Sequence, residues 1–157
     1  MKNQQLFELF NALNTVTGLS GVRFNYAIAK NIATLKPEIL SLQEALKASE
    51  EFNKYDTERI EIAKKHAKKD ENGEPIKQNV GTQEQFIIED KELFDKEFEA
   101  LKEAHKEVYE ARLKQLKDFE DLLEVENPVV LHKIKLSDIP EDIKTEQLAG
   151  IYPLIEE

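Results

Sequence analysis

The sequence contains no cysteine and only five glycines and five prolines among its 157 residues. Disulfide bonds and thiolate metal sites are therefore excluded, which is compatible with a reducing compartment. Charged residues make up 34% of the chain, well above the roughly 25% of ordinary globular domains, and favour long solvent-exposed helices. Polar residues interrupt every apolar run, including the N-terminal MKNQQLFELFNALN. We therefore expect neither a signal peptide nor a membrane segment.

The net charge of -10 is concentrated in the second half of the chain. Residues 1–69 carry a net charge of +3, whereas residues 70–157 carry -13. Because a nucleic-acid backbone is neutralised by a basic surface, this balance predicts no direct binding to nucleic acid. One small basic cluster is the exception, and its lysines also suit the last turn of a helix, facing the negative end of the dipole. Its members are Lys64, Lys65, Lys68 and Lys69.

Helical periodicity covers most of the chain. Residues 4–14 place apolar side chains on one face of a short first helix. A second helix begins near Phe24, continues to about Lys68 and carries an apolar stripe whose steps alternate between four and three residues, as in a coiled coil. Pro37 lies inside it, so we expect a kink near Leu35 and Lys36, or two helices that meet there. The stripe of the second helix begins with Ile28, Ile32, Leu35, Ile39, Leu42 and Leu46.

Residues 70–90 differ in character from their helical neighbours. Turn-forming Asn72-Gly73 and the helix-breaking Pro75 precede the strand-like QFIIE, and predict a small β-hairpin with strands at 75–79 and 85–89 joined through Gly81-Thr82. Asp90 then caps a third helix that ends before Asn127-Pro128. Two long helices separated by a short hairpin most simply run antiparallel.

After Pro128, the segment VVLHKIKL predicts a strand with Val130, His132, Ile134 and Leu136 on one face. A short helix capped by Thr145 follows, docked through Leu148, Ile151, Leu154 and Ile155. The predicted fold is thus mainly α with minor β. It is a long antiparallel helical hairpin with a small β-hairpin at its turn, a short N-terminal helix, and a C-terminal strand plus short helix. Residues 1–157 are expected to form a single domain.

The stretch KDENGEP gathers oxygen-bearing side chains around a glycine, as a calcium-binding loop does. An EF-hand that began at Asp70 would need glycine at position six and a bidentate glutamate at position twelve, but Pro75 and Gly81 stand there. The stretch is therefore interpreted as a turn. An irregular calcium site built from Asp70, Asn72 and Glu74 is left open as an alternative.

No catalytic group stands out elsewhere. The three histidines, His66, His105 and His132, have no spacing that would place two of them on one helical face. Most carboxylates fall beside lysines on the polar faces of helices, where they are typical of solvated surface pairs. We therefore expect no enzymatic activity, no cofactor and no metal.

The segments YAIAKN…LKPEI, KDENGEP and HKIKLSDIPEDI resemble a family of small, mostly helical proteins encoded by tailed bacteriophages and prophages, chiefly of Gram-positive hosts. The resemblance covers nearly the whole chain. That family has no established activity, so the resemblance implies a biological setting and no catalytic residues. The setting is the cytoplasm of a bacterial host during infection, or the virion.

These observations favour a non-enzymatic phage accessory protein that binds a phage or host protein, or itself as a homo-oligomer, in virion or tail assembly. The first alternative is an inhibitor of a host protein or antiviral defence system, acting by acidic mimicry of nucleic acid. The second is a nucleic-acid-handling accessory factor that uses Lys64 to Lys69 and the pair Lys133 and Lys135. The candidate interaction residues are Leu6, Phe10 and Leu13 in the first helix and Glu120, Asp121 and Glu124 near the end of the third.

Overall fold

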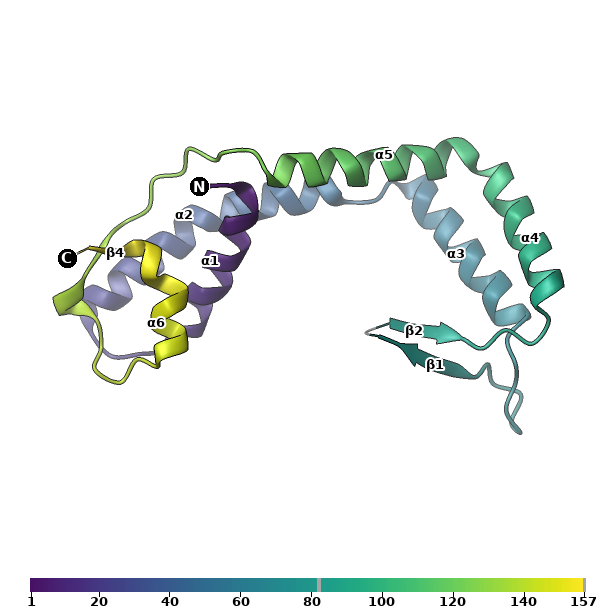
Figure 1. Cartoon of the computed structure of the whole chain (residues 1–157), viewed down its shortest axis with the longest axis horizontal. Coiled ribbons are helices and arrows are strands. Elements are labelled where there is room, and N and C mark those ends of the chain that lie inside the picture. The colour runs from purple at the N-terminus through teal and green to yellow at the C-terminus, as the bar shows by residue number, and fades with distance from the viewer. Residues whose placement is uncertain (82, 157) are drawn as a thin grey trace. The chain divides into compact units, whose positions relative to one another are not determined.

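The computed structural model describes residues 1–81 and 83–156 and is mainly helical (Figure 1). The α-helices of these residues are α1 (Asn3–Thr15), α2 (Val22–Leu46), α3 (Glu50–Lys65), α4 (Lys91–Ala104), α5 (Lys106–Leu123) and α6 (Thr145–Ile151). The strands β1 (Lys77–Val80) and β2 (Gln83–Phe86) form an antiparallel hairpin, and β3 (Ile134–Lys135) pairs in parallel with β4 (Ile155–Glu156). Mainly α structure with minor β is therefore confirmed. Within the described ranges, each helix is too short or too polar to cross a membrane.

Contacts divide the chain into two compact units. Unit 1 contains residues 1–47 and 116–157, and unit 2 contains residues 48–115. One boundary follows α2, and the other lies within α5. The single domain expected over residues 1–157 stays a prediction.

Unit 1 holds the hydrophobic core of the protein. Helix α1 packs against α2 and α6, and its leucines at positions 6, 9 and 13 share one face because a helix repeats every 3.6 residues. The short 3-10 helix η2 (Tyr152–Leu154) follows α6 and places Leu154 in the same core. The buried core residues are Leu6, Leu9, Leu13, Val16, Phe24, Ala27, Ile28, Leu35, Ile39, Leu42, Ile134, Ile151 and Leu154.

The C-terminal segment of unit 1 differs from the predicted strand. Pairing is confined to β3, with Ile134 opposite Ile155, and the supposed strand face is not shared, since Val130 is 86% exposed and Ile134 only 1%. Instead, the fully buried amide of Asn31 on α2 holds this segment: its Nδ2 donates to the carbonyl of His132 (2.8 Å), and its Oδ1 accepts from the His132 N–H (2.7 Å). A side chain therefore takes the place of a neighbouring strand.

The final helix begins at Thr145, as predicted, but Thr145 is its first helical residue rather than its cap. The cap position is occupied by Lys144, whose backbone N–H donates to Oε1 of Gln147 (3.1 Å). Ile151 and Leu154 are buried as expected, whereas Leu148 and Ile155 are half-buried.

The second predicted helix is divided, but not at Pro37. Helix α2 continues through the exposed Pro37 and ends at Leu46. Helix α3 then begins behind Ser49, whose hydroxyl accepts the N–H of Phe52 (3.1 Å). Two glutamates in the first turn of α3 complement the positive end of its dipole. A strong N-cap, rather than the proline, therefore sets where the chain starts a new helix.

Unit 2 contains the predicted β-hairpin, but its strands are Lys77–Val80 and Gln83–Phe86 rather than the expected 75–79 and 85–89. Lys77 pairs with Phe86 and Val80 with Gln83, and Gly81 adopts the positive φ of 63° that the turn requires. The other predicted turn residue, Thr82, lies outside the described residues. An antiparallel bridge between Ala67 and Ile88 continues the pairing toward α3 and α4.

The third predicted helix is also divided. Asp90 caps α4 as expected, with its carboxylate accepting the N–H of Leu93 (3.0 Å). However, the helix is interrupted at His105, which separates α4 from α5. The His105 ring lies 5.7 Å from that of Tyr55, and its Nε2 lies 3.3 Å from Glu58.

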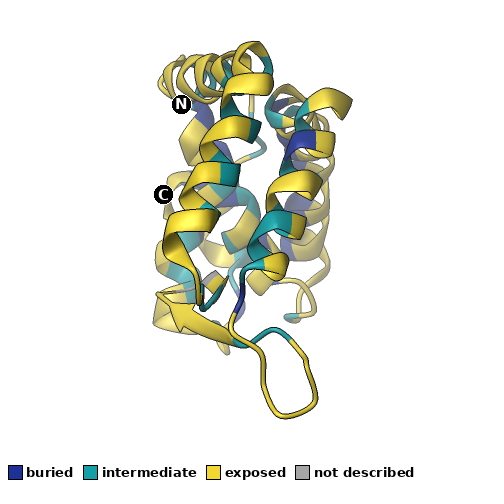
Figure 2. Ribbon diagram, turned by 90° about the vertical axis from the view of Figure 1, so that its right-hand side faces the viewer, coloured by how far each residue is buried: buried dark blue, intermediate teal, exposed yellow. Residues whose placement is uncertain are grey.

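Burial in unit 2 is sparse (Figure 2). Helix α3 packs against α4, yet Tyr55 and Ala67 are the buried apolar residues among the described members of this unit. Helices α4 and α5 contain no buried residue over their described lengths. Many apolar side chains of unit 2 are therefore only partly covered by this chain.

Candidate functional site

The candidate residues of α1 pack in or against the hydrophobic core of unit 1. Leu6 and Leu13 are 0% exposed and belong to the core, and Phe10 is half-buried against it. Leu6 and Leu13 therefore offer no surface to a partner in this structure, which corrects their assignment as interaction residues. The apolar stripe of α1 is explained by its packing against α2 and α6.

The candidate acidic residues are exposed at the end of α5. Glu124 does not present a free charge, because its Oε2 lies 2.6 Å from Nζ of Lys2. This hydrogen bond, together with the charge of Glu124, raises the pKa of Lys2. Glu120 and Asp121 make no ion pair with the rest of the described chain. The acidic group is thus smaller than the sequence suggests.

One candidate site is a groove of about 800 Å³ in unit 2. Helix α3 contributes Ile60 and Ala63, α4 contributes Phe94 and Phe98, and the hairpin segment contributes Phe86 and Ile88. All six side chains are half-buried. The rings of Phe94 and Phe98 stack with their centroids 5.6 Å apart. The groove therefore has an apolar floor that water contacts in this chain.

The two helical walls of the groove carry opposite charges. Arg59 and Lys64 stand on α3, and Asp95 and Glu99 stand on α4. Each base makes an exposed ion pair along its own helix, Arg59 with Asp56 and Lys64 with Glu61, at 2.7 Å in both cases. Such exposed pairs contribute only about 0–1 kcal/mol. Asp95 and Glu99 have no ion-pair partner in the described ranges.

A group of charged and aromatic side chains connects the end of α3 to α4. Glu97 accepts a hydrogen bond from Nζ of Lys65 (2.6 Å), and its second oxygen lies 3.2 Å from Nε2 of His66. The hydrogen bond from Lys65, with the nearby imidazole, lowers the pKa of Glu97. The His66 side chain is 8% exposed, and its ring packs edge-on against Phe94. These contacts fix the alignment of the two helices.

Tyr55 is the centre of an aromatic cluster toward the other end of α3. Its ring contacts those of Phe52, His105 and Tyr109, with centroids 5.6–6.1 Å apart. Burial raises the pKa of Tyr55, so the phenol stays neutral at ordinary pH. The guanidinium of Arg112 lies over the Phe52 ring of this cluster, 5.5 Å from its centroid. This arrangement packs the aromatic rings of α3, α5 and the residue between α4 and α5 against one another.

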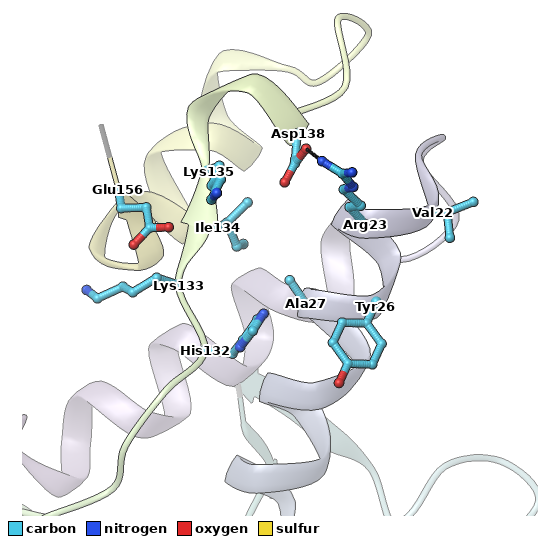
Figure 3. A pocket seen from close by; sticks show the side chains of 10 residues that line it. All are labelled: Val22, Arg23, Tyr26, Ala27, His132, Lys133, Ile134, Lys135, Asp138 and Glu156. Carbon is cyan, nitrogen blue, oxygen red and sulfur yellow. Dashed lines mark ion pairs between the residues drawn. The ribbon is translucent and has the colours of Figure 1, made fainter.

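A smaller pocket of about 380 Å³ lies in unit 1 (Figure 3). Tyr26 of α2 stands edge-on to His132, with centroids 5.8 Å apart, and Ala27 and Ile134 form the apolar wall. An ion pair of 3.8 Å between Arg23 and Asp138 borders it. The remaining charged residues of the lining are Lys133, Lys135 and Glu156.

The KDENGEP stretch forms a turn in which Asp70 serves the backbone. Its Oδ1 accepts the N–H groups of Asn72 (2.8 Å) and Glu74 (2.9 Å), and Gly73 has a φ of 82°. This geometry is that of an Asx turn. Over the described residues, no three His, Asp or Glu side chains gather as a metal ion would require.

Comparison with protein families, with curated proteins and with solved structures found no match to this chain.

Sequence reasoning missed the groove because three segments far apart in the chain build it. Periodicity marks Phe94 and Phe98 as apolar positions of a helix, but the same pattern is typical of a buried face. The hairpin residues Phe86 and Ile88 give no signal that they border the same surface. The sequence does offer one signal: the apolar stripes of the second and third predicted helices are longer than the short first helix could cover.

Proposed function

We propose that this protein is a non-enzymatic phage accessory protein that acts by binding another protein through unit 2, in virion or tail assembly. In this proposal α3 and α4 form the antiparallel helical hairpin, the β-hairpin marks its turn, and the groove is the contact surface. The observation that carries the proposal is the sparse burial of unit 2, in which Tyr55 and Ala67 are the buried apolar residues among the described members of that unit.

The groove supplies the driving force for binding. Burial of apolar surface contributes about 25 cal/mol per Å². A partner that covers the half-buried side chains of Phe94 and Phe98 therefore stabilises the complex. A contiguous apolar patch rimmed by charges is typical of protein–protein contact surfaces. The phage setting rests on the resemblance of the sequence segments, which implies the host cytoplasm or the virion.

The alternatives are less well supported. Of the three acidic residues considered for mimicry of nucleic acid, Glu120 and Asp121 are exposed. The charge of Glu124 is compensated by Lys2. The nucleic-acid-handling alternative loses support because Lys64 and Lys65 both make ion pairs with glutamates.

The test is site-specific photocrosslinking in infected cells. A benzophenone amino acid replaces Gln85, an exposed residue on the rim of the groove, and the control chain carries it at Gln43, an exposed residue of α2. We expect crosslinked proteins from position 85 and none from position 43, identified by mass spectrometry from cell extracts and from purified virions. Equal or absent crosslinking at the two positions contradicts the proposal.

A further inference from the structure

We propose that the groove face of unit 2 is self-complementary and pairs with the same face of a second copy of this chain, around a two-fold axis parallel to α3 and α4. The inference rests on the proposed function, since it names the partner that the groove receives. Its basis is the distribution of charge on the two sides of the apolar floor.

The two helices run in opposite directions along the groove. The end of α3 contacts the first half of α4, through Lys65 and Glu97 (2.6 Å), whereas the first half of α3 contacts the end of α4, through Tyr55 and His105. By this register Asp95 lies within about one helical turn of the level of Lys64, and Glu99 lies within about one helical turn of the level of Arg59. Each level of the groove has a base on one wall and an acid on the other.

A two-fold axis parallel to the helices brings α3 of one copy opposite α4 of the other at the same level. Lys64 then faces Asp95 of the second copy, and Arg59 faces its Glu99. A two-fold axis perpendicular to the helices would instead set α3 against α3 and α4 against α4, with like charges opposed. The charge pattern therefore selects one of the two symmetric arrangements.

The intrachain contacts leave these charges available. Asp95 and Glu99 make no ion pair with other described residues, and the exposed pairs of Arg59 and Lys64 exchange at little cost. In the hairpin wall, Lys77 and Glu84 neutralise each other at 3.0 Å. Pairing also covers the phenylalanines of both copies at once, so that four helices surround one shared apolar layer. A partner of one charge sign would match only one of the two walls.

The experiment measures the sedimentation of the purified full chain over a range of concentrations. It compares the unmodified chain with two variants, each with the charges of one groove wall reversed. Variant A carries Asp95→Lys and Glu99→Lys, so both of its walls are basic. Variant B carries Arg59→Glu and Lys64→Glu, so both are acidic. We expect the unmodified chain to dimerise, and each variant alone to dissociate at least tenfold more readily. We expect an equimolar mixture of A and B to form a heterodimer, because each wall then meets its opposite.

A matched control reverses Glu141 and Asp142, exposed acids of unit 1, with the same change in net charge. We expect it to dimerise as the unmodified chain does. Circular dichroism checks that every variant keeps its helices. If variant B does not fold, Arg59→Gln with Lys64→Gln replaces it, and at least a tenfold rise in the dissociation constant is expected.

A monomeric unmodified chain, or a mixture of A and B that stays monomeric while both are folded, overturns the two-fold pairing. Neither result touches the proposed function, because crosslinking from Gln85 in infected cells would still capture a different protein. Conversely, A and B could form a heterodimer while Gln85 gives no crosslink to a different protein. That result would keep the two-fold pairing and contradict the proposal that unit 2 binds a different protein.

Discussion

At the scale of single residues, buried asparagines connect distant parts of unit 1. Asn3, 5% exposed, donates to the carbonyl of Leu122 (2.8 Å) and accepts from Asn127 (3.0 Å). Asn31 joins α2 to the backbone of His132. Helical periodicity could not foresee either role, because a polar residue inside an apolar stripe finds its partner only in the folded chain.

Asn31→Ala tests this role. The change leaves the N–H and carbonyl of His132 without their partner, and we expect a loss of about 2 kcal/mol in the free energy of unfolding, measured in urea. Asn11→Ala is the control, because Asn11 is exposed on α1, and a change within about 0.5 kcal/mol is expected there. An Asn31→Ala protein as stable as the control would mean that water replaces the amide.

Glu97 provides a residue-scale prediction about pH. Its pKa in the folded chain is lowered from 4.5, chiefly by the hydrogen bond from Lys65. A lowered folded-state pKa adds stability above the unfolded value, and this stability is lost as the pH falls through the folded pKa. We therefore expect Glu97→Gln to lower the melting temperature at neutral pH and to match the unmodified chain in strong acid. Glu103→Gln, at an exposed position of α4, controls for the loss of one charge. A constant difference across the acid range would contradict the linkage.

At the scale of elements, the close approach of α1 and α6 depends on Gly150. A Cβ built at this glycine lies 2.7 Å from Cβ of Ala12, and neither atom belongs to a flexible side chain. Glycine normally costs a helix about 1 kcal/mol relative to alanine. Its presence in a seven-residue helix is explained by the space that it leaves for α1.

Gly150→Ala should therefore destabilise the protein, although helix propensity alone predicts the opposite. We expect a net loss of about 1 kcal/mol in the free energy of unfolding, since overpacking costs about 1–3 kcal/mol. Ala12→Gly in the same chain should relieve the contact, giving a favourable interaction energy of about 1 kcal/mol in a double-mutant cycle. Additive effects of the two changes would show that the helices move apart freely.

The sequence predicts elements well where the signals are local and strong. The first helix, the β-hairpin and the Asp90 cap follow from periodicity and turn chemistry. The divisions at Ser49 and His105 were missed because an apolar stripe continues across each of them, so that the caps and packing decide the boundary. The groove was missed for a different reason: its walls come from α3, α4 and the hairpin, and only their arrangement makes a surface.

At the scale of the whole molecule, the uneven distribution of burial between the units predicts uneven stability. The core cluster of thirteen buried residues belongs to unit 1, whereas unit 2 relies on partly exposed contacts. Amide protection against hydrogen exchange follows the burial of apolar contacts. We therefore expect amides in the middle of α1 and α2 to exchange at least tenfold more slowly than those in the middle of α4, by mass spectrometry of the chain at low concentration.

The same experiment at high concentration separates intrinsic stability from partner binding. If a second copy covers the groove, α3 and α4 gain protection as the concentration rises, while α1 and α2 do not change. The charge-reversed Asp95→Lys, Glu99→Lys chain should show no such gain and serves as the control. Equal protection of α1, α2 and α4 at all concentrations would instead mean that residues 1–157 unfold as one cooperative domain. In that case unit 2 would be as stable as unit 1 despite its exposed groove.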